Sequence, residues 1–306
     1  MKRAVCLFLI CILTLSCAGC DRACHETVFA MDTVMDLQVW GADSEQAVQA
    51  IAGLLQDMDN LWSARKEDSK IAALNRGETV TDALLEQVQK LSQRTNGAFD
   101  PCLYNIMTLW GFDNKEYHVP AQAQIDEAML QPKWDLGGVV KGYAGQLAAE
   151  SLASFNVSHA VLNLGGNVQT YGNKPTGEPW SIGIQNPAGG DYVGLVSVVG
   201  TMSIVTSGDY QRYFEQDGVR YHHIMDPETG MPARSGLSSV TVICKDGLTA
   251  DGLSTALFVM GLEKAVEFWR KSDDFEAVFI TDTGKIYATQ GAGLSGCEYE
   301  VIADEN

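Results

Sequence analysis

Asp251 and Thr255 stand four residues apart in TADGLSTALF, a segment whose apolar spacing predicts a helix. Residues at this spacing share one helix face, so both side-chain oxygens could hold the same ligand. Mg²⁺ prefers such oxygens and is usually held by few protein groups, with water and substrate phosphates completing its shell. The alternative is structural, with an aspartate at the positive helix end and a threonine bonded to its own helix backbone. The pair alone leaves both interpretations open.

Two adjacent histidines precede a turn in YHHIMDPETGMP, residues 221–232. Histidine is the side chain that can move a proton near neutral pH. On a strand, His222 and His223 would point to opposite faces, so we expect at most one of them to face a site. The composition of residues 226–230 is typical of a turn, and a structural histidine beside a structural loop is the alternative.

The segment WDLGGVVKGYA is similar to a phosphate-binding loop but matches neither of the two well-known ones. A Walker A loop needs Ser or Thr after its lysine, whereas Gly142 follows Lys141. The spacing of Gly137, Gly138 and Gly142 also differs from the dinucleotide fingerprint. These glycines predict a close approach of backbone to a ligand, of a kind that the spacing does not specify.

Helices early in the chain and strands in its middle must position these residues. The patterns predict helices over 44–61 with Ser44 as N-cap, from Thr81 or Asp82 to Asn96, over 143–152, and over 249–272 with a break at Gly261. They predict a strand over 25–41, a short turn at 126–131, β-rich segments across 159–244, and a closing hairpin over 275–289 that turns at 282–284. This order favours an α+β fold with mixed or antiparallel sheets, in one continuous domain that could have two lobes, over a doubly wound parallel sheet.

The overall charge argues against nucleic acid as a partner. The 306 residues carry a net charge of −18, and such an acidic surface repels phosphate backbones. Any anionic ligand would therefore need a local positive or metal-assisted site. The apolar fraction of 46% is enough for a sizeable core.

The first residues, MKRAVCLFLICILTLSCAGC, have the layout of a secretory signal, with a basic start, an apolar run and small residues. The run is too short for a membrane span. Its end is similar to the lipobox of bacterial lipoproteins. We therefore expect a signal peptide over 1–19 and a lipid such as palmitate on Cys20, which would tether the chain to the outer face of the cytoplasmic membrane, on the periplasmic side in a two-membrane cell. An ordinary signal cut nearby is the alternative.

The remaining cysteines, Cys24, Cys102, Cys244 and Cys297, are widely separated. No C-x-x-C pair occurs after the signal, so neither a zinc ribbon nor a redox dithiol is indicated. One or two disulfides and free thiols both remain open.

Several motifs in order resemble the ApbE family of FAD:protein FMN transferases, once described as thiamine-biosynthesis lipoproteins. They are AMDTVMDL, SKIAALN, GAFDP, LWGF, DLGGVVKGYA, NLGGN, TSGDYQRYF, HHIMDPETG and ADGLSTALFVMG. The resemblance covers nearly all of residues 20–306 and implies one ApbE-like catalytic domain there. It implies that the chain cleaves FAD, attaches FMN by a phosphoester to Ser or Thr of a target protein, and releases AMP, with Mg²⁺ required.

The resemblance also assigns roles to individual residues. It implies metal ligands at Asp251, Thr255 and an oxygen near Gly138. It implies FAD contacts at Met31, Arg65, Ala98, Phe99, Asp100, Asp135, Lys141 and Met225. His223 is the expected base for the target hydroxyl, with His222 as the fallback and Asp226 helping to fix the loop.

Two positions depart from the family pattern. Ser254 stands where some relatives carry a second acid, so a second metal ion is not expected. Arg65 stands where the family often places a Tyr or Trp that stacks on a cofactor ring, and arginine can also stack on an aromatic face. This change leaves open the balance between transfer to a protein and hydrolysis of FAD by water. A lipoprotein that only binds flavin is a further alternative, but it would have no use for the His223 and Asp251–Thr255 groups.

Overall fold

The computed structural model describes residues 23–304, so the expected signal segment and the lipid site at Cys20 lie outside the described residues. The helices are α1 (Ser44–Trp62), α2 (Lys70–Asn75), α3 (Ala83–Arg94), α4 (Tyr104–Leu109), α5 (Gln122–Met129), α6 (Val140–Ser151) and α7 (Gly247–Arg270), with a 3₁₀ turn η1 (Leu152–Ser154). The strands of the main sheet are β1 (Ala23–Ala30), β2 (Thr33–Gly41), β3 (Val157–Asn163), β4 (Asn167–Tyr171), β7 (Ser203–Gly208), β10 (Leu237–Cys244), β11 (Phe275–Thr281), β12 (Ile286–Thr289) and β14 (Glu300–Ile302). The remaining strands are β5 (Trp180–Gln185), β6 (Tyr192–Val198), β8 (Tyr213–Gln216), β9 (Val219–His222) and β13 (Leu294–Ser295).

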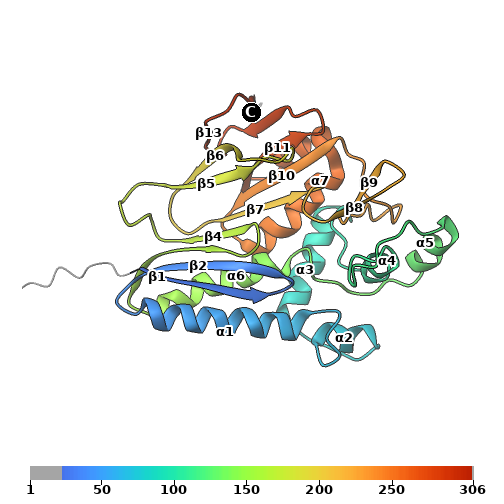
Figure 1. Cartoon of the computed structure of the whole chain (residues 1–306), viewed down its shortest axis with the longest axis horizontal. Helices are drawn as coiled ribbons and strands as arrows, with labels where there is room; N and C mark the ends of the chain where they lie inside the picture. Colours follow the sequence, from blue (N-terminus) through green and yellow to red (C-terminus); the bar gives the residue numbers. More distant parts are fainter. Residues whose placement is uncertain (1–22, 305–306) are drawn as a thin grey trace, which may run out of the picture.

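The nine strands of the main sheet are ordered β1-β2-β3-β4-β7-β10-β11-β12-β14. Every neighbouring pair is antiparallel except β12 and β14, which are parallel. Two smaller sheets, β13-β6-β5 and β8-β9, complete the described part of the chain (Figure 1). The α+β class with mixed sheets in a single domain is therefore confirmed.

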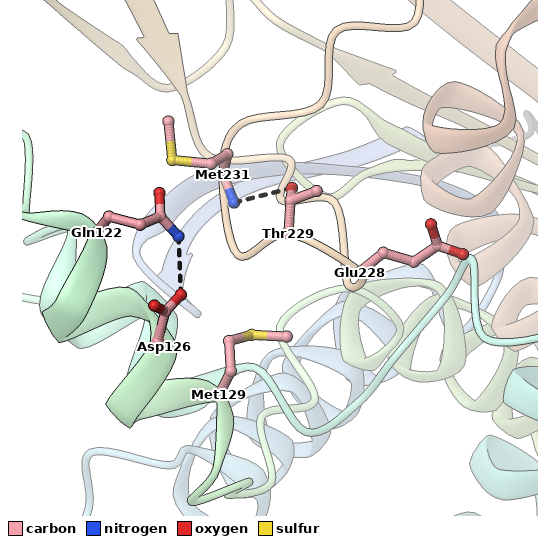
Figure 2. Close-up of a pocket in the computed structure, with 6 residues that line it drawn as sticks. All are labelled: Gln122, Asp126, Met129, Glu228, Thr229 and Met231. Atoms are coloured by element: carbon pink, nitrogen blue, oxygen red, sulfur yellow. Dashed lines mark hydrogen bonds between the residues drawn. The ribbon is translucent and has the colours of Figure 1, made fainter.

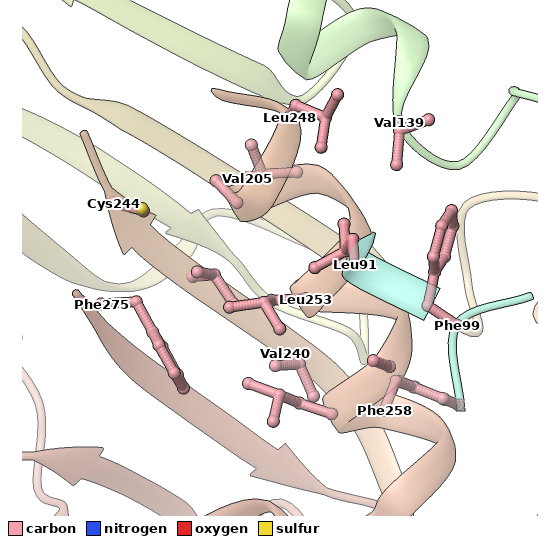
Figure 3. Close-up of a cluster of buried hydrophobic side chains, with 14 of the residues drawn as sticks. Leu91, Phe99, Val139, Val205, Val240, Cys244, Leu248, Leu253, Phe258 and Phe275 are labelled. Atoms are coloured by element: carbon pink, nitrogen blue, oxygen red, sulfur yellow. The ribbon is translucent and has the colours of Figure 1, made fainter. Parts of the chain in front are cut away.

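Alternating residues of the central strands bury both faces of the main sheet, as the period of two along a strand requires. In β10, Val240, Val242 and Cys244 belong to the cluster packed beneath α7, whereas Ile243 belongs to the cluster under β5 and β6. Figure 3 shows the first cluster, in which Leu253 of α7 lies among side chains of the strands. A third cluster joins α1 and α6 to β2 and β3. Helices α1, α6 and α7 thus cover one face of the sheet, and the small three-stranded sheet covers the other.

The strand predicted over 25–41 is wrong as a single strand. It is a hairpin of β1 and β2, paired from Ala23 with Trp40 to Ala30 with Thr33. Met31 and Asp32 form its two-residue turn with φ values of 49° and 60°, the left-handed region that type I′ turns require. The alternation of apolar and polar residues continues through the turn, so the sequence pattern gives no sign of a break.

Several element boundaries also differ from the predictions. Helix α1 begins at Ser44 with Asp43 as the N-cap residue, and α6 begins at Val140 rather than Tyr143. The expected turn at 126–131 overlaps helix α5, and two short strands follow the predicted closing hairpin. The predicted cap at Asp82 is confirmed, because its carboxylate accepts the Leu84 N–H. The predicted break of α7 at Gly261 is also confirmed by a φ of 76°.

Within residues 23–304 no helix is long and apolar enough to cross a bilayer. Cys24, Cys102, Cys244 and Cys297 are free thiols.

Candidate functional site

A cavity of about 680 Å³, called here the main pocket, opens where loops leave the main sheet and the N-terminal part of α7. Its walls come from the β1–β2 turn, the end of α1, the loops around residues 98–113 and 135–141, the β3–β4 turn, the end of β7 and the loop after β9. Of the site residues expected from the sequence, only Asp226 does not line the main pocket. The expected residues that do line it are Met31, Arg65, Ala98, Phe99, Asp100, Asp135, Gly138, Lys141, His223, Met225, Asp251 and Thr255. The fold therefore brings together residues that the chain separates by more than two hundred positions.

Asp251 is the least exposed polar side chain that lines the main pocket, at 4%. The Gly142 N–H donates to Oδ2 of Asp251 at 2.8 Å. Helices α6 and α7 meet at this point so closely that a Cβ on Gly142 would lie 2.0 Å from the carbonyl oxygen of Gly247. Gly142 therefore serves helix packing and the placement of Asp251, whereas the sequence suggested that this glycine opens the backbone to a ligand.

Hydroxyl groups surround the Asp251 side of α7. Ser254 is fully buried and its Oγ donates to the backbone oxygen of Asp251 at 2.7 Å. Ser207, at the end of β7, lies 2.8 Å from the Ser254 Oγ and 3.3 Å from the Thr255 Oγ1. Because Ser254 is buried and bonded, it is poorly placed to replace a second acidic ligand.

The donor set fits Mg²⁺ better than a metal held by protein alone. Within residues 23–304 no three His, Cys, Asp or Glu side chains gather as a metal cluster. Asp251 and Thr255 would supply one carboxylate and one hydroxyl, and phosphate oxygens would supply further ligands. Burial raises the pKa of Asp251, and the nearby Lys141 opposes this rise. A bound cation would favour the ionised carboxylate in the same way.

The main pocket holds three basic side chains among six aspartates. Lys141, Arg65 and Arg212 all line it. Loss of solvent lowers the pKa of Arg212, and the nearby Asp135 opposes that effect. Burial likewise raises the pKa of Asp135, whose Oδ1 accepts the Gly137 N–H at 2.8 Å. Because six aspartates share these walls, an anionic ligand would depend on the individual cations or on a bound metal ion.

Arg65 ties three segments together at the mouth of the pocket. Its Nη2 forms a short ion pair with the Asp32 carboxylate in the β1–β2 turn. Its Nη1 donates to the carbonyl oxygen of Asp113 at 2.9 Å. Arg65, at a position where the sequence resemblance led us to expect an aromatic side chain, therefore holds the mouth together, and only its planar face remains for stacking.

The apolar side of the main pocket comes from the loop after α3. Phe99 is 3% exposed, and its N–H donates to the Thr95 Oγ1 at 3.2 Å. A Cβ on Gly138 would lie 3.2 Å from the Phe99 ring and 3.9 Å from the Thr255 Oγ1. Gly138 thus separates the aromatic side of the pocket from the hydroxyl side. Asp100 uses Oδ1 to accept the Cys102 N–H at 2.8 Å.

His223 has one ring nitrogen bonded and one directed to no partner in the described chain. Its Nδ1 lies 3.2 Å from the carbonyl oxygen of Arg212, which can only accept, so Nδ1 carries the proton. Nε2 is then the unprotonated nitrogen. Burial and the nearby Arg212 hold the pKa of His223 well below its usual 6.5, so the ring is neutral at pH 7. A neutral ring with a free lone pair is what a general base requires.

His222 is a structural histidine. Its Nε2 donates to the Ala233 oxygen at 3.0 Å, and its Nδ1 accepts the Ile224 N–H at 3.3 Å. The ring meets Phe258 edge-on with centroids 5.5 Å apart. Burial lowers its pKa to about 4. Both ring nitrogens of His222 therefore bond to the backbone. As expected, only one of the two histidines, His223, faces the main pocket.

Asp226 fixes the loop after His223 and does not line the main pocket. Its Oδ1 accepts the Glu228 N–H at 2.9 Å, and its carbonyl oxygen accepts the Gly230 N–H at 2.8 Å. The outer side of this loop forms a separate crevice with α5, lined by Glu228, Thr229, Met231, Gln122, Asp126 and Met129 (Figure 2). The loop thus has its Pro227 side in the main pocket and its Glu228 side in the crevice.

The profile of the ApbE family matches residues 31–279. This chain belongs to the ApbE family. It is 32% identical to the FAD:protein FMN transferase of Treponema pallidum (strain Nichols), with 92% of each chain covered, and 32% identical to that of Klebsiella pneumoniae (strain 342), with 85% of this chain and 90% of the relative covered.

Solved structures of ApbE proteins have the same fold. The ApbE protein of Thermotoga maritima superposes with a TM-score of 0.81 at 31% identity, covering 88% of this chain and 97% of the other. The apo form of the Pseudomonas stutzeri flavinyl transferase ApbE superposes with a TM-score of 0.75 at 30% identity, covering 87% and 93%.

Reasoning from the sequence missed several residues of this ApbE pocket. Arg212 and Ser207 both lie in the quoted motif TSGDYQRYF, but neither was assigned a role. An arginine four residues after the glycine that ends a strand, in a chain this acidic, could have drawn attention to Arg212. Asp32 and Asp113 were missed because their partner, Arg65, acts across three segments.

Proposed function

We propose that this chain is a Mg²⁺-dependent FAD:protein FMN transferase. It would cleave the pyrophosphate of FAD, join FMN through a phosphoester to a Ser or Thr hydroxyl of a target protein, and release AMP. The names of its ApbE relatives support this proposal. The target would be a subunit of a redox complex or an extracellular flavoprotein that carries a motif of the type Asp-Gly-x-Ser/Thr-Gly-Ala-Thr.

The observation that supports the proposal most strongly is that three kinds of chemical group line the same pocket. The oxygens of Asp251 and Thr255, the cationic groups of Lys141 and Arg212, and the free Nε2 of His223 all line it. A protein that only bound flavin would need the apolar wall but not a neutral base beside a hard-oxygen pair. This combination supports a phosphoryl-transfer enzyme.

The residues can divide the reaction between them. Nε2 of His223 would take the proton of the target hydroxyl as its oxygen bonds to the phosphorus of the FMN half. The bond from that phosphorus to the bridging pyrophosphate oxygen breaks, and AMP leaves with the bridging oxygen and the electron pair. Lys141 and Arg212 would hold the charged phosphates in place, which acts mainly through positioning and electrostatics.

Mg²⁺ would be held by Asp251, Thr255 and an oxygen near Gly138, and when bound it would supply stabilisation of the charge that develops on the phosphates. Asp251 is fixed for this role by its bond from Gly142 and by the helix contact beneath it.

The test uses the chain without its first nineteen residues, FAD, Mg²⁺ and a small protein that bears the acceptor motif. The acceptor should gain the mass of one FMN and in-gel flavin fluorescence, and EDTA should abolish both. An unmodified acceptor with free FMN and AMP would instead indicate an FAD pyrophosphatase, and intact bound FAD would indicate a flavin-binding lipoprotein.

We also propose that the chain is exported and anchored by lipid on Cys20 to the outer face of the cytoplasmic membrane. The support is the signal-like start and the Ala-Gly-Cys sequence before the described domain. Labelled palmitate should enter the full-length chain and not a Cys20→Ala variant, and the variant should leave the membrane fraction. A membrane-bound Cys20→Ala variant without label would contradict the lipid anchor.

A further inference from the structure

The hairpin of β8 and β9 forms a two-stranded sheet of its own beside the main pocket. Its turn is the two residues Asp217 and Gly218, with φ values of 53° and 75°. In such a hairpin the residues flanking the turn exchange both backbone hydrogen bonds, and every second pair does so thereafter. The pairs that bond are therefore Gln216 with Val219 and, two residues on, Phe214 with Tyr221.

The next hydrogen-bonded pair along the hairpin, Arg212 with His223, is observed directly. The His223 N–H donates to the Arg212 oxygen at 3.1 Å, as the alternation requires. Tyr213 and Glu215 therefore direct their backbone N–H and C=O groups away from β9. Both residues are exposed, and in residues 23–304 no third strand pairs with β8. The outer edge of β8 is an open template for another extended chain.

The two edges of the hairpin differ. On β9, the outward oxygen of Arg220 already accepts Nη2 of Arg234 at 2.6 Å. On β8, no backbone hydrogen bond from Tyr213 or Glu215 to a loop is present in the described chain. An incoming strand would therefore find free donors and acceptors on β8, while a side chain already occupies the β9 edge.

Aromatic packing holds the hairpin firmly in position. The rings of Phe214 and Tyr221 stack with centroids 5.3 Å apart, and Tyr117 stacks on Phe214 at 5.4 Å. Trp110 meets Tyr221 at 5.5 Å. A pre-ordered edge of this kind lowers the entropy cost of adding a strand.

The edge leads into the main pocket. Strand β8 follows Arg212 and strand β9 precedes His223, and both of these residues line the pocket. An extended segment paired along Tyr213 and Glu215 would therefore end beside Arg212, which pairs with His223 across the hairpin and lines the main pocket with it. Because the edge of β8 continues into the main pocket, the target protein is the partner that fits it. The proposed reaction must bring a hydroxyl of that protein into the pocket, where Nε2 of His223 is free.

We propose that the outer edge of β8 is the docking site of the target protein, whose acceptor segment adds to the hairpin as a third strand. The occupant is an extended segment that carries a Ser or Thr at its pocket end and pairs through its main chain. The inference rests on the proposed transferase function. Main-chain pairing would supply affinity with little demand on sequence, and the pocket would select the hydroxyl.

The first test compares Glu215→Pro with Glu215→Ala in the chain without its first nineteen residues. Both variants remove the carboxylate that lies 3.7 Å from Arg220, but only proline removes the outward N–H. The acceptor is a short peptide with the Asp-Gly-x-Thr-Gly-Ala-Thr motif. We expect the KM for this peptide to rise about 10-fold in Glu215→Pro relative to Glu215→Ala, while the Kd for FAD is equal in the two. An equal KM in both variants would overturn the proposal.

A second test changes the acceptor instead of the enzyme. Peptides carrying one backbone N-methyl group at successive positions should lose reactivity at every second position, because only alternate N–H groups face β8. Loss at all positions alike, or at none, would contradict strand addition. This series also decides the matter if proline disturbs the hairpin and weakens FAD binding.

The results separate this inference from the proposed function. If the unaltered chain fails to modify the peptide and a whole acceptor protein, the transferase itself is wrong. If it modifies them without the alternating pattern, only the docking site is wrong. If the unaltered chain is dimeric and Glu215→Pro is monomeric, a second copy occupies the edge and the proposal falls.

Discussion

The two ends of the main pocket are built in different ways. At the inner end, Asp251 is 4% exposed and is held by the contact of Gly142 and Gly247 between α6 and α7. At the mouth, Arg65 and Asp32 have side chains 42% and 39% exposed and join loops rather than helices. The inner end can therefore hold a fixed geometry for phosphate chemistry. The mouth can accept replacement of its residues with less effect on the fold.

Asp251→Asn should have the largest effect and would show that the inner end carries the chemistry. Asparagine keeps the size of the side chain and the bond from Gly142 but loses the charge. Turnover of FAD should fall about 10⁴-fold, because metal-assisted charge stabilisation is worth several kcal/mol. FAD binding without Mg²⁺, measured by flavin fluorescence, should change little.

Glu263→Gln is the matched control, since Glu263 is exposed on the distal half of α7. Its turnover should equal that of the unaltered chain. Turnover that survives in Asp251→Asn would disprove the metal assignment.

His223→Gln should lower the rate of transfer by about 10²–10⁴-fold, the usual contribution of a positioned base. FAD affinity should be retained. Because the pKa of His223 lies well below 6.5, the transfer rate of the unaltered chain should stay level as pH falls through 6.5 and drop only at lower pH. A pH–rate profile that bends at 6.5, or a fully active His223→Gln, would remove His223 from the reaction.

Gly142→Ala tests the rigidity of the inner end. The new Cβ would lie 2.0 Å from the Gly247 oxygen, so the helices must separate. We expect the free energy of unfolding to fall by about 3 kcal/mol. Gly53→Ala in α1 is the control, because its Cβ would meet nothing within 4 Å. That change should raise stability by about 0.5–1 kcal/mol. Equal denaturation midpoints for the two variants would contradict the close helix contact.

The lowered pKa of His222 leads us to expect a pH dependence of stability that is separate from catalysis. Its pKa is about 4 in the folded chain against 6.5 as the ordinary value, so the unfolded chain binds more protons between these values. The free energy of unfolding should therefore decrease as pH falls from 6.5 to 4, by about 3 kcal/mol from this group. Urea denaturation at several pH values measures this slope, which should be shallower in His222→Gln. An unchanged slope in that variant would show that other groups cause it.

Arg65→Trp at the mouth should have the smallest effect. It removes the pair with Asp32 and the bond to the Asp113 oxygen but supplies the aromatic side chain that the resemblance to the ApbE family led us to expect. We expect the KM for FAD to change by less than about 10-fold, because exposed ion pairs contribute little. Arg65→Ala, which loses both kinds of contact, should raise the KM more. A loss of turnover in Arg65→Trp comparable with that of Asp251→Asn would contradict the contrast between the two ends.

Local patterns were sufficient to predict the long helices and the central strands, but not the order of the strands in the sheet. The β-rich composition of β10 and β11, the cap at Asp82 and the break at Gly261 depend on residues close in sequence, and all three were found. The turn at Met31 and Asp32 was missed because neither residue is the glycine or asparagine that usually marks a type I′ turn. Its left-handed geometry is the one that a two-residue connection between the paired strands β1 and β2 requires.

The site was predicted through motifs, and its contacts were not. Motif residues such as Asp251 and His223 can be read from the sequence because their neighbours in the chain identify them. The meeting of Gly142 with Gly247 and the three-way bonding of Arg65 depend on helices and loops brought together by the whole fold. The free edge of β8 could likewise not be predicted from the sequence, because it depends on which strands remain unpaired in the folded sheet.

The central claim is that a hydroxyl of the target protein, and not water, attacks the phosphorus of FAD. The most direct test is to run the reaction in water labelled with heavy oxygen and to measure the masses of the products by mass spectrometry. The mixture would hold the chain without its first nineteen residues, FAD, Mg²⁺ and the acceptor protein. If the target hydroxyl attacks phosphorus, the acceptor gains one FMN and neither the AMP nor the new phosphoester contains the heavy isotope. Heavy oxygen in free FMN or in AMP, with the acceptor unchanged, would show that water is the nucleophile and would contradict the transferase.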